Sequence, residues 1–287
     1  MTAPPGYELG PAYAKDVTGI FYRGIQLSLD RAVTIKMLRD KTTRKDAVFN
    51  HFVKEISIAT SLEHANLLLA VDSGVMNGRP YLVTEPTAEP TLDEVLEPKE
   101  PLPEMRAVHI ALGIAHAIRH LESKRFIYKN LRPKNILLPR PAAPKLLTFR
   151  YVKPFDEARA FRRANVQSAG YCAPELVRID LGPVSPRANV YALGAILYHM
   201  LAGTPAIEGA SSEVRRMHAR GKVPPLRETR PYMRERAYTT VSRLMTYDPA
   251  KRPDPSAAVA LLDAYANDPL LGKTITSRKK RRRRRRR

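Results

Sequence analysis

Residues 128–138 read YKNLRPKNILL, a basic loop that leads directly into three apolar residues, and they are the most informative segment for the fold. Two asparagines, Asn130 and Asn135, lie within this loop. Thirteen residues after Asn135 the chain reads Thr148-Phe149-Arg150, and further along it reads Ala173-Pro174-Glu175. Each motif is weak by itself, but their order and spacing along one chain together form a strong signal.

The part of the chain before these motifs is predicted to be mostly β-sheet with one helix. Residues 21–23, 32–38 and 81–84 are the clearest strands, and residues 45–62 show helical spacing of apolar side chains. In that helix Phe49, Phe52, Val53, Ile56 and Ala59 are predicted to share one face. Lys36 lies on a predicted strand, and Glu55 lies toward the buried side of the helix.

The second half of the chain is predicted to be mostly helical. Helical spacing recurs over residues 105–121, 190–201, 238–245 and 256–265. Five prolines and five glutamates between residues 85 and 103 indicate a connector. The predicted organisation is α+β and bilobal: a leader (1–6), a small β-rich lobe (7–84), a hinge and connector (85–103), a larger helical lobe (104–266) and a basic disordered tail (267–287).

Taken together, the motifs resemble those of the protein kinase superfamily, over roughly residues 7–266, and are most similar to those of bacterial serine/threonine kinases. Residues 128–138 resemble the catalytic loop H-R-D-L-x-x-x-N, residues 148–150 stand where the family has D-F-G, and residues 173–175 are its A-P-E element. Residues 189–194 resemble the start of the central buried helix, and residues 248–253 resemble the arginine-bearing loop near the end of the fold.

The resemblance implies a nucleotide site in which Lys36 contacts phosphates and Glu55 orients its ammonium group. Asn135 stands at a family metal-ligand position, Thr84 at the gatekeeper position, and Glu85 opens the hinge. The adenine slot is predicted from Phe21, Thr34 and Leu137. Two alternatives remain open: Lys36 and Glu55 form an ion pair that only holds the helix, and the bulky Phe21 fills the slot itself.

The sequence departs from the family at the positions that carry the chemistry. Asn130 replaces the catalytic aspartate and cannot accept a proton at neutral pH, and Thr148 replaces the magnesium-binding aspartate. Arg150 adds a positive charge, while Ala14 and Asp16 stand where the phosphate-binding loop has glycines, so that Asp16 is expected to repel phosphates. No catalytic residue is intact and no metal site is predicted; the residues that remain allow ATP binding but disfavour magnesium.

The leading interpretation is therefore a pseudokinase that acts as a scaffold or allosteric regulator of a protein partner, such as an active kinase or its substrate. The first alternative is a residual serine/threonine kinase of unusual mechanism. Asp156 and Glu157 are candidates for a substitute metal ligand, although a solvated acidic pair explains them as well. Ser168 is expected to make a local hydrogen bond.

Charge supplies the second alternative, a protein that binds nucleic acid or an anionic membrane. The net charge is +21, and ten units come from the run of arginines and lysines that begins at Arg278 and ends at Arg287. Such a run acts electrostatically and would tether the domain to an anionic polymer or membrane surface. The sequence has no secretory signal, and its single cysteine, Cys172, is expected to be buried. A cytoplasmic location is therefore predicted, with the periphery of a membrane as the alternative.

Overall fold

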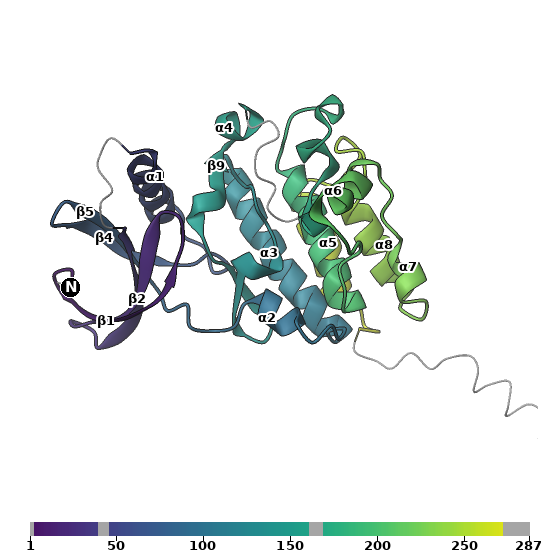
Figure 1. Cartoon of the computed structure of the whole chain (residues 1–287). Coiled ribbons are helices and arrows are strands. Elements are labelled where there is room, and N and C mark those ends of the chain that lie inside the picture. The colour runs from purple at the N-terminus through teal and green to yellow at the C-terminus, as the bar shows by residue number, and fades with distance from the viewer. Residues whose placement is uncertain (1–2, 40–45, 161–168, 272–287) are drawn as a thin grey trace, which may run out of the picture.

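The computed structural model describes residues 3–39, 46–160 and 169–271, and Figure 1 shows that they form two lobes. The smaller lobe contains an antiparallel sheet in the order β1-β2-β3-β5-β4 and one helix, α1, which lies against it. Its elements are β1 (Tyr7–Lys15), β2 (Gly19–Gln26), β3 (Arg31–Leu38), α1 (Ala47–Ser61), β4 (Ala70–Met76) and β5 (Arg79–Thr84). The predicted bilobal α+β fold is confirmed.

The central strand β3 is buried on both faces, and this burial sorts its side chains. Val33, Ile35 and Met37 pack with Tyr22 and Val83 on one face of the sheet. Because successive side chains of a strand point to opposite faces, Thr34 and Lys36 belong to the other face, toward α1. The strand period therefore aims the buried lysine into the space between the sheet and the helix.

Helix α1 packs against the core with the face that its apolar residues predicted, except at Val53. The buried side chains are Phe52, Glu55, Ile58 and Ala59, whereas Val53 is 43% exposed. The prediction for Val53 was wrong because the packed stripe is centred on Phe52 and Glu55, and Glu55 is held there by its partner on β3. The core face of the helix thus includes Glu55, on the side where the sequence placed it.

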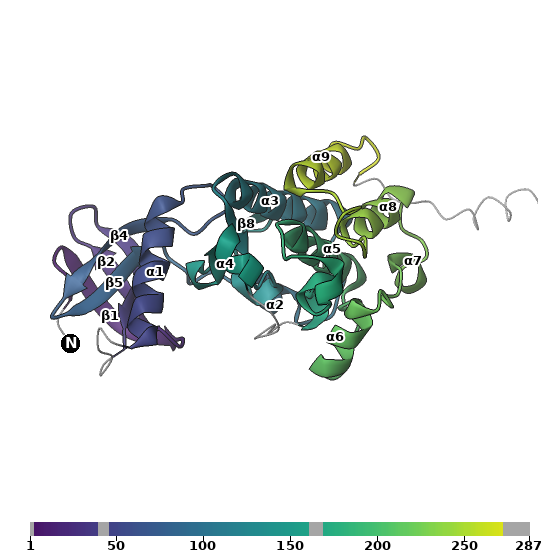
Figure 2. The same cartoon turned by 90° about the horizontal axis from the view of Figure 1, so that it is seen from above.

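The larger lobe is helical and is built around α5 (Arg187–Ala202), whose residues from Ala188 to Leu201 are all buried. Figure 2 shows α5 beside its neighbours α3 and α8. The other helices are α2 (Leu92–Leu96), α3 (Glu104–Ser123), α4 (Phe155–Ala160), α6 (Ser211–Ala219), α7 (Leu226–Thr229), α8 (Glu235–Leu244) and α9 (Pro255–Ala266). Two short antiparallel pairs, β6 (Phe126–Tyr128) with β9 (Val152–Pro154) and β7 (Ile136–Arg140) with β8 (Ala143–Leu146), face the smaller lobe.

Two buried polar contacts fix the loops of this lobe. The guanidinium of Arg252 donates to both carboxylate oxygens of Glu175 at 2.6 and 3.0 Å, and both side chains are fully enclosed. The side chain of Asn189, on α5, bonds the backbone N–H and carbonyl of Tyr128, with its oxygen 3.0 Å from the Tyr128 nitrogen. Asn189 thus attaches the start of residues 128–135 to α5, and Arg252 joins the loop before α9 to residue 175. Among the described residues, no helix is long and apolar enough to cross a membrane.

Candidate functional site

A cavity of about 310 Å³ lies between the two lobes. Its upper wall comes from β1, β2 and β3, its back from Glu55 of α1, and its lower wall from Lys134, Asn135 and residues 147–151. The predicted site residues Phe21, Thr34, Lys36, Glu55 and Asn135 all line this one cavity. We refer to it as the cleft.

At the back of the cleft the predicted lysine and glutamate are joined. The Lys36 Nζ atom lies 3.0 and 2.8 Å from the two carboxylate oxygens of Glu55, and both side chains are buried. The same ammonium lies 5.1 Å from the ring centroids of Phe21 and Phe52. A cation enclosed by aromatic rings and a carboxylate is well held in position.

A second carboxylate, that of Asp16, also binds the Lys36 ammonium group. Asp16 Oδ2 lies 2.8 Å from Lys36 Nζ, and Asp16 Oδ1 accepts the backbone N–H groups of Thr18 and Gly19, each at 2.8 Å. Burial by itself would raise the pKa of the Asp16 carboxyl, but the attraction of Lys36 and these hydrogen bonds outweigh it and lower the pKa. Asp16 therefore stays ionised and folds inward, onto the lysine that the resemblance assigns to phosphate.

The two positions where the resemblance places catalytic aspartates carry neutral side chains. The Thr148 hydroxyl lies 3.4 Å from Glu55 Oε1 and donates toward it. Asn130 is buried and does not line the cleft; it lines a separate cavity of about 20 Å³ together with Tyr171 and Cys172. Its backbone carbonyl accepts the Asn135 side-chain amide at 2.8 Å.

Positive charge surrounds the loop on this side. Burial, and then the nearby Lys153, lower the pKa of Lys129 to about 8. Burial also lowers the pKa of Lys153, which lies on β9 beside the loop. Arg150 lines the cleft itself. A divalent cation in the cleft would thus lie near these cations, and the carboxylates among the described lining residues, Asp16 and Glu55, are already bound to Lys36.

Two predicted cofactor-binding residues, Leu137 of the adenine slot and Glu85 of the hinge, do not line the cleft. Leu137 is buried in the β7–β8 pair, opposite Lys145. Glu85 turns its side chain away, so that its Oε1 accepts from Lys145 Nζ at 2.6 Å and from the Leu69 N–H at 2.7 Å. The apolar lining comes instead from Leu68, Leu82 and Leu147.

Tyr13 and Thr87 are site residues that the sequence analysis did not find. The Tyr13 hydroxyl lies 2.6 Å from Thr87 Oγ1 and 3.2 Å from Thr34 Oγ1, so it bridges β1 and the hinge. The available signal was an aromatic residue immediately before the altered glycine positions. Its direction depends on the strand register, which the sequence does not show.

The remaining candidates lie elsewhere. Glu157 pairs with Lys54, and Asp156 is exposed beside it at the start of α4. Within the ranges that the structure describes, no group of three or more histidine, cysteine or acidic residues could hold a metal ion. Cys172 is buried, as expected, and burial raises its pKa to about 12. Ser168 and the basic run fall outside the described residues.

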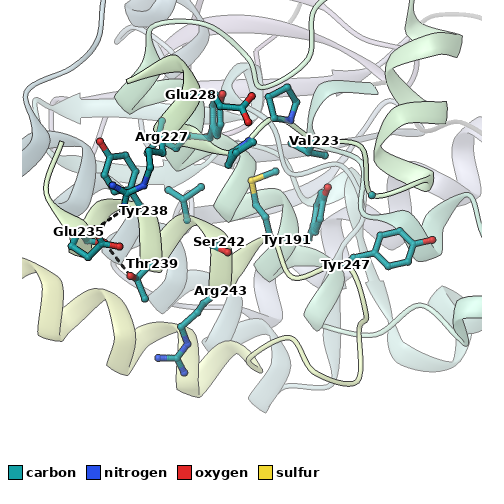
Figure 3. A pocket seen from close by; sticks show the side chains of 17 residues that line it. Tyr191, Val223, Arg227, Glu228, Glu235, Tyr238, Thr239, Ser242, Arg243 and Tyr247 are labelled. Atoms are coloured by element: carbon teal, nitrogen blue, oxygen red, sulfur yellow. Dashed lines mark hydrogen bonds and ion pairs between the residues drawn. The ribbon is translucent and has the colours of Figure 1, made fainter. Parts of the chain in front are cut away.

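A larger cavity, of about 610 Å³, lies within the helical lobe between α5, α7 and α8, and Figure 3 shows its lining. Two of its charged side chains, Arg227 and Glu235, pair with each other, and Arg227 also covers the Tyr238 ring at 4.0 Å. The buried ion cluster and the motif residues described above lie in the cleft and not in this cavity. The cleft is therefore the candidate site.

Comparison with known proteins agrees with this choice. The family model described as "Protein kinase domain" matches residues 17–263. This chain belongs to the protein kinase family. The match begins within the β1–β2 turn and ends within α9, so it includes most of both lobes and the cleft residues from Phe21 onward. Family membership implies a fold built to bind ATP.

The curated relatives include bacterial serine/threonine-protein kinases at low identity. PknB of Mycobacterium leprae is 27% identical over 221 residues, which cover 74% of this chain and 35% of PknB. PrkC of Bacillus subtilis is 26% identical over a region that covers 80% of this chain and 36% of PrkC. RqkA of Deinococcus radiodurans, described as DNA damage-responsive, is 28% identical over a region that covers 91% of this chain and 39% of RqkA. The kinase domain thus spans little more than a third of these relatives.

Proposed function

We propose that this kinase domain is catalytically impaired and acts as a scaffold or allosteric regulator that binds nucleotide weakly and without magnesium. One observation carries the proposal. Among the described residues that line the cleft, the only carboxylates are Asp16 and Glu55, and both are bound to Lys36. Magnesium in such sites is held by carboxylates and substrate phosphates, so this cleft offers it no protein ligand of the preferred kind.

The proton-transfer step also lacks its residue. An asparagine amide does not take a proton from an attacking hydroxyl at neutral pH, and loss of a general base typically costs about 10²- to 10⁴-fold in rate. Asn130 is moreover buried away from the cleft. Loss of the base and of the metal ligand together leaves positioning as the only catalytic contribution.

Binding of a metal-free nucleotide has support in the charges of the cleft. Lys15, Lys36, Lys134 and Arg150 line it, against the two carboxylates of Asp16 and Glu55. This excess of cations can neutralise phosphate charge that magnesium neutralises in active kinases. The nucleotide would be bound as an allosteric ligand rather than turned over.

Buried contacts that keep the helical lobe folded support the scaffold part of the proposal. The Arg252–Glu175 pair and the Asn189 contacts to Tyr128 keep the helical lobe and its loops in place. A domain that stays folded without its catalytic carboxylates can still bind a protein partner, such as an active kinase or its substrate. Its curated relatives are serine/threonine-protein kinases, which makes phosphorylation signalling the setting that we propose.

A phosphate-transfer assay tests this proposal against residual kinase activity. Purified protein is incubated with magnesium, radiolabelled ATP and a generic protein substrate, with Lys36→Ala as the matched control. We expect no label above the control on the protein itself or on the substrate. Transfer by the wild type that Lys36→Ala abolishes would establish the alternative, a residual kinase that uses Lys36, Glu55 and Asn135.

The basic run from Arg278 to Arg287 supports a second, compatible function, tethering to an anionic polymer or membrane surface. Each phosphate that it neutralises releases counterions, so binding should fall steeply with salt. Deletion of the run should abolish salt-sensitive retention of the protein on RNA, DNA or acidic vesicles. Unchanged retention of the truncated protein would refute the tether.

A further inference from the structure

The end of β1 and the turn that follows it line the cleft from Tyr13 to Asp16. We propose that residues 13–19, here called the plug, form an intramolecular occupant of the nucleotide site that a nucleotide must displace. The plug is fastened by Tyr13 at the end where the base would bind and by Asp16 at the phosphate end. This inference builds on the proposed nucleotide site, but it holds whether or not the bound nucleotide is turned over.

An irregularity in β1 directs Tyr13 over the cleft. Ala12 pairs with Tyr22 and Ala14 pairs with Phe21, so Tyr13 is one extra residue opposite the continuous strand β2. A bulge of this kind bends its strand and re-aims a side chain. The Tyr13 ring centroid lies 6.4 Å from that of Phe21, which places it beside the other aromatic residue of the predicted slot.

The Tyr13 hydroxyl closes a triangle of hydroxyl groups across the slot. It lies 2.6 Å from Thr87 Oγ1 and 3.2 Å from Thr34 Oγ1, and these two oxygens lie 3.3 Å apart. Thr34 is a buried wall residue of the predicted adenine slot, and Thr87 belongs to the hinge. A base that packs against Thr34 must therefore first move the tyrosine.

At the other end Asp16 occupies the position of an anion. Its carboxylate lies 2.8 Å from Lys36 Nζ, and the turn fixes it through Thr18 and Gly19. A nucleotide phosphate would need the same ammonium, so phosphate and Asp16 compete for one cation. Because Asp16 is part of the same chain, its effective concentration at Lys36 is high, and the apparent affinity for nucleotide is reduced accordingly.

The two fastening points are mechanically linked. Only Ala14 and Lys15 lie between Tyr13 and Asp16, and the Asp16 N–H donates to the Gly19 carbonyl at 2.9 Å, which closes the turn. Release of one end in so short a segment frees the other end to move. Substitutions at Tyr13 and Asp16 should therefore have coupled rather than independent effects on nucleotide affinity.

The test is a calorimetric titration of the full chain with ATP in the presence of EDTA. The variants are Tyr13→Phe, which removes one hydroxyl, Asp16→Asn, which removes one charge, and the double variant. We expect a gain of about threefold for Tyr13→Phe and about tenfold for Asp16→Asn, since each raises the open fraction of the site. The gain in the double variant should differ from the product of the single gains.

The controls are Tyr232→Phe and Asp30→Asn, which make the same chemical changes at exposed positions far from the cleft. They should bind ATP as the wild type does, and thermal unfolding should show that all variants are folded. The plug is refuted if either single variant binds ATP no more tightly than the wild type, or if the double variant shows no binding at millimolar ATP. Neither outcome depends on phosphate transfer, so the plug is tested separately from the catalytic part of the proposed function. ATP binding by the wild type that the single variants do not tighten would refute the plug alone, and absence of binding in every protein would refute the nucleotide site as well.

Discussion

The ammonium of Lys36 and the carboxylate of Asp16 lie 2.8 Å apart, although the resemblance places phosphate at one partner and a glycine at the other. The lysine is almost fully enclosed, while the aspartate reaches it from the edge of the cleft. With Glu55 on its other side, Lys36 binds two carboxylates at once. The lysine that a kinase uses on its nucleotide is thus engaged by the protein itself.

Removal of this cation should destabilise the fold. Lys36→Met leaves Asp16 and Glu55 as close, partly buried carboxylates without a counter-charge, which typically costs about 3–5 kcal/mol in the free energy of unfolding. Urea unfolding at pH 7 measures the loss. The variant Lys36→Met with Glu55→Gln should recover part of it; a loss below about 1 kcal/mol for Lys36→Met would contradict the assigned burial.

The Arg252–Glu175 pair should contribute far more to stability than a surface pair. Arg252→Met leaves the enclosed Glu175 carboxylate without its two hydrogen bonds, and we expect a loss of about 3–5 kcal/mol. The matched control is Arg216→Met, which breaks the exposed pair with Glu213 and should cost less than about 1 kcal/mol. Equal losses in the two variants, measured by urea unfolding, would show that enclosure of the pair has no effect.

Two buried histidines predict a loss of stability in mild acid. Burial lowers the pKa of His199 and of His218 to about 4 each. The unfolded chain binds these protons near pH 6.5, so the free energy of unfolding should fall as the pH drops from about 6.5 toward about 4.

His218→Gln tests this assignment, because glutamine can still bond the Tyr191 hydroxyl, which lies 2.8 Å from His218 Nδ1, but does not titrate. Urea unfolding at pH 7 and pH 5 should show a smaller difference in this variant than in the wild type. An identical pH dependence in the two proteins would refute a role for His218.

The contact between Asp16 and Lys36, unlike the stability set by the two histidines, should not change between pH 7.5 and pH 6. The pKa of Asp16 is lowered in the folded protein, so its contact with Lys36 is complete above the ordinary aspartate pKa of about 4 and is lost only as the pH falls below that. The gain in ATP affinity from Asp16→Asn should therefore be the same at pH 7.5 and pH 6. Calorimetric titrations at the two values measure it, and a gain that vanishes at pH 6 would mean that Asp16 is already protonated there.

Restoring one carboxylate should create a response to magnesium. In Thr148→Asp the new carboxylate replaces a hydroxyl 3.4 Å from Glu55, which should destabilise the free protein through like charge. A divalent cation relieves that repulsion, so magnesium should raise the thermal stability of this variant and tighten ATP binding about tenfold. Thr148→Asn, which lacks the charge, is the control, and an equal response of the two variants would contradict the assignment.

The resemblance to protein kinases predicted which residues meet in the cleft, and the regular periods of strand and helix explain how two of them do so. Lys36 lies on a strand and Glu55 on a helix, and periods of 2 and 3.6 residues bring them face to face across nineteen positions. The inward turn of Asp16 does not follow from a period, because it depends on local bonds to Thr18 and Gly19. Tyr13 was missed for a similar reason, since one extra residue in β1 changes where its side chain points.

The most direct test of the central claim is the effect of magnesium on ATP binding by the wild-type chain. Calorimetric titrations with ATP are made in EDTA and in excess magnesium at matched ionic strength. Because the cleft offers magnesium no free carboxylate, the affinity should be the same or weaker with magnesium. Binding that is at least about tenfold tighter with magnesium would show a coordinated cation and contradict the account.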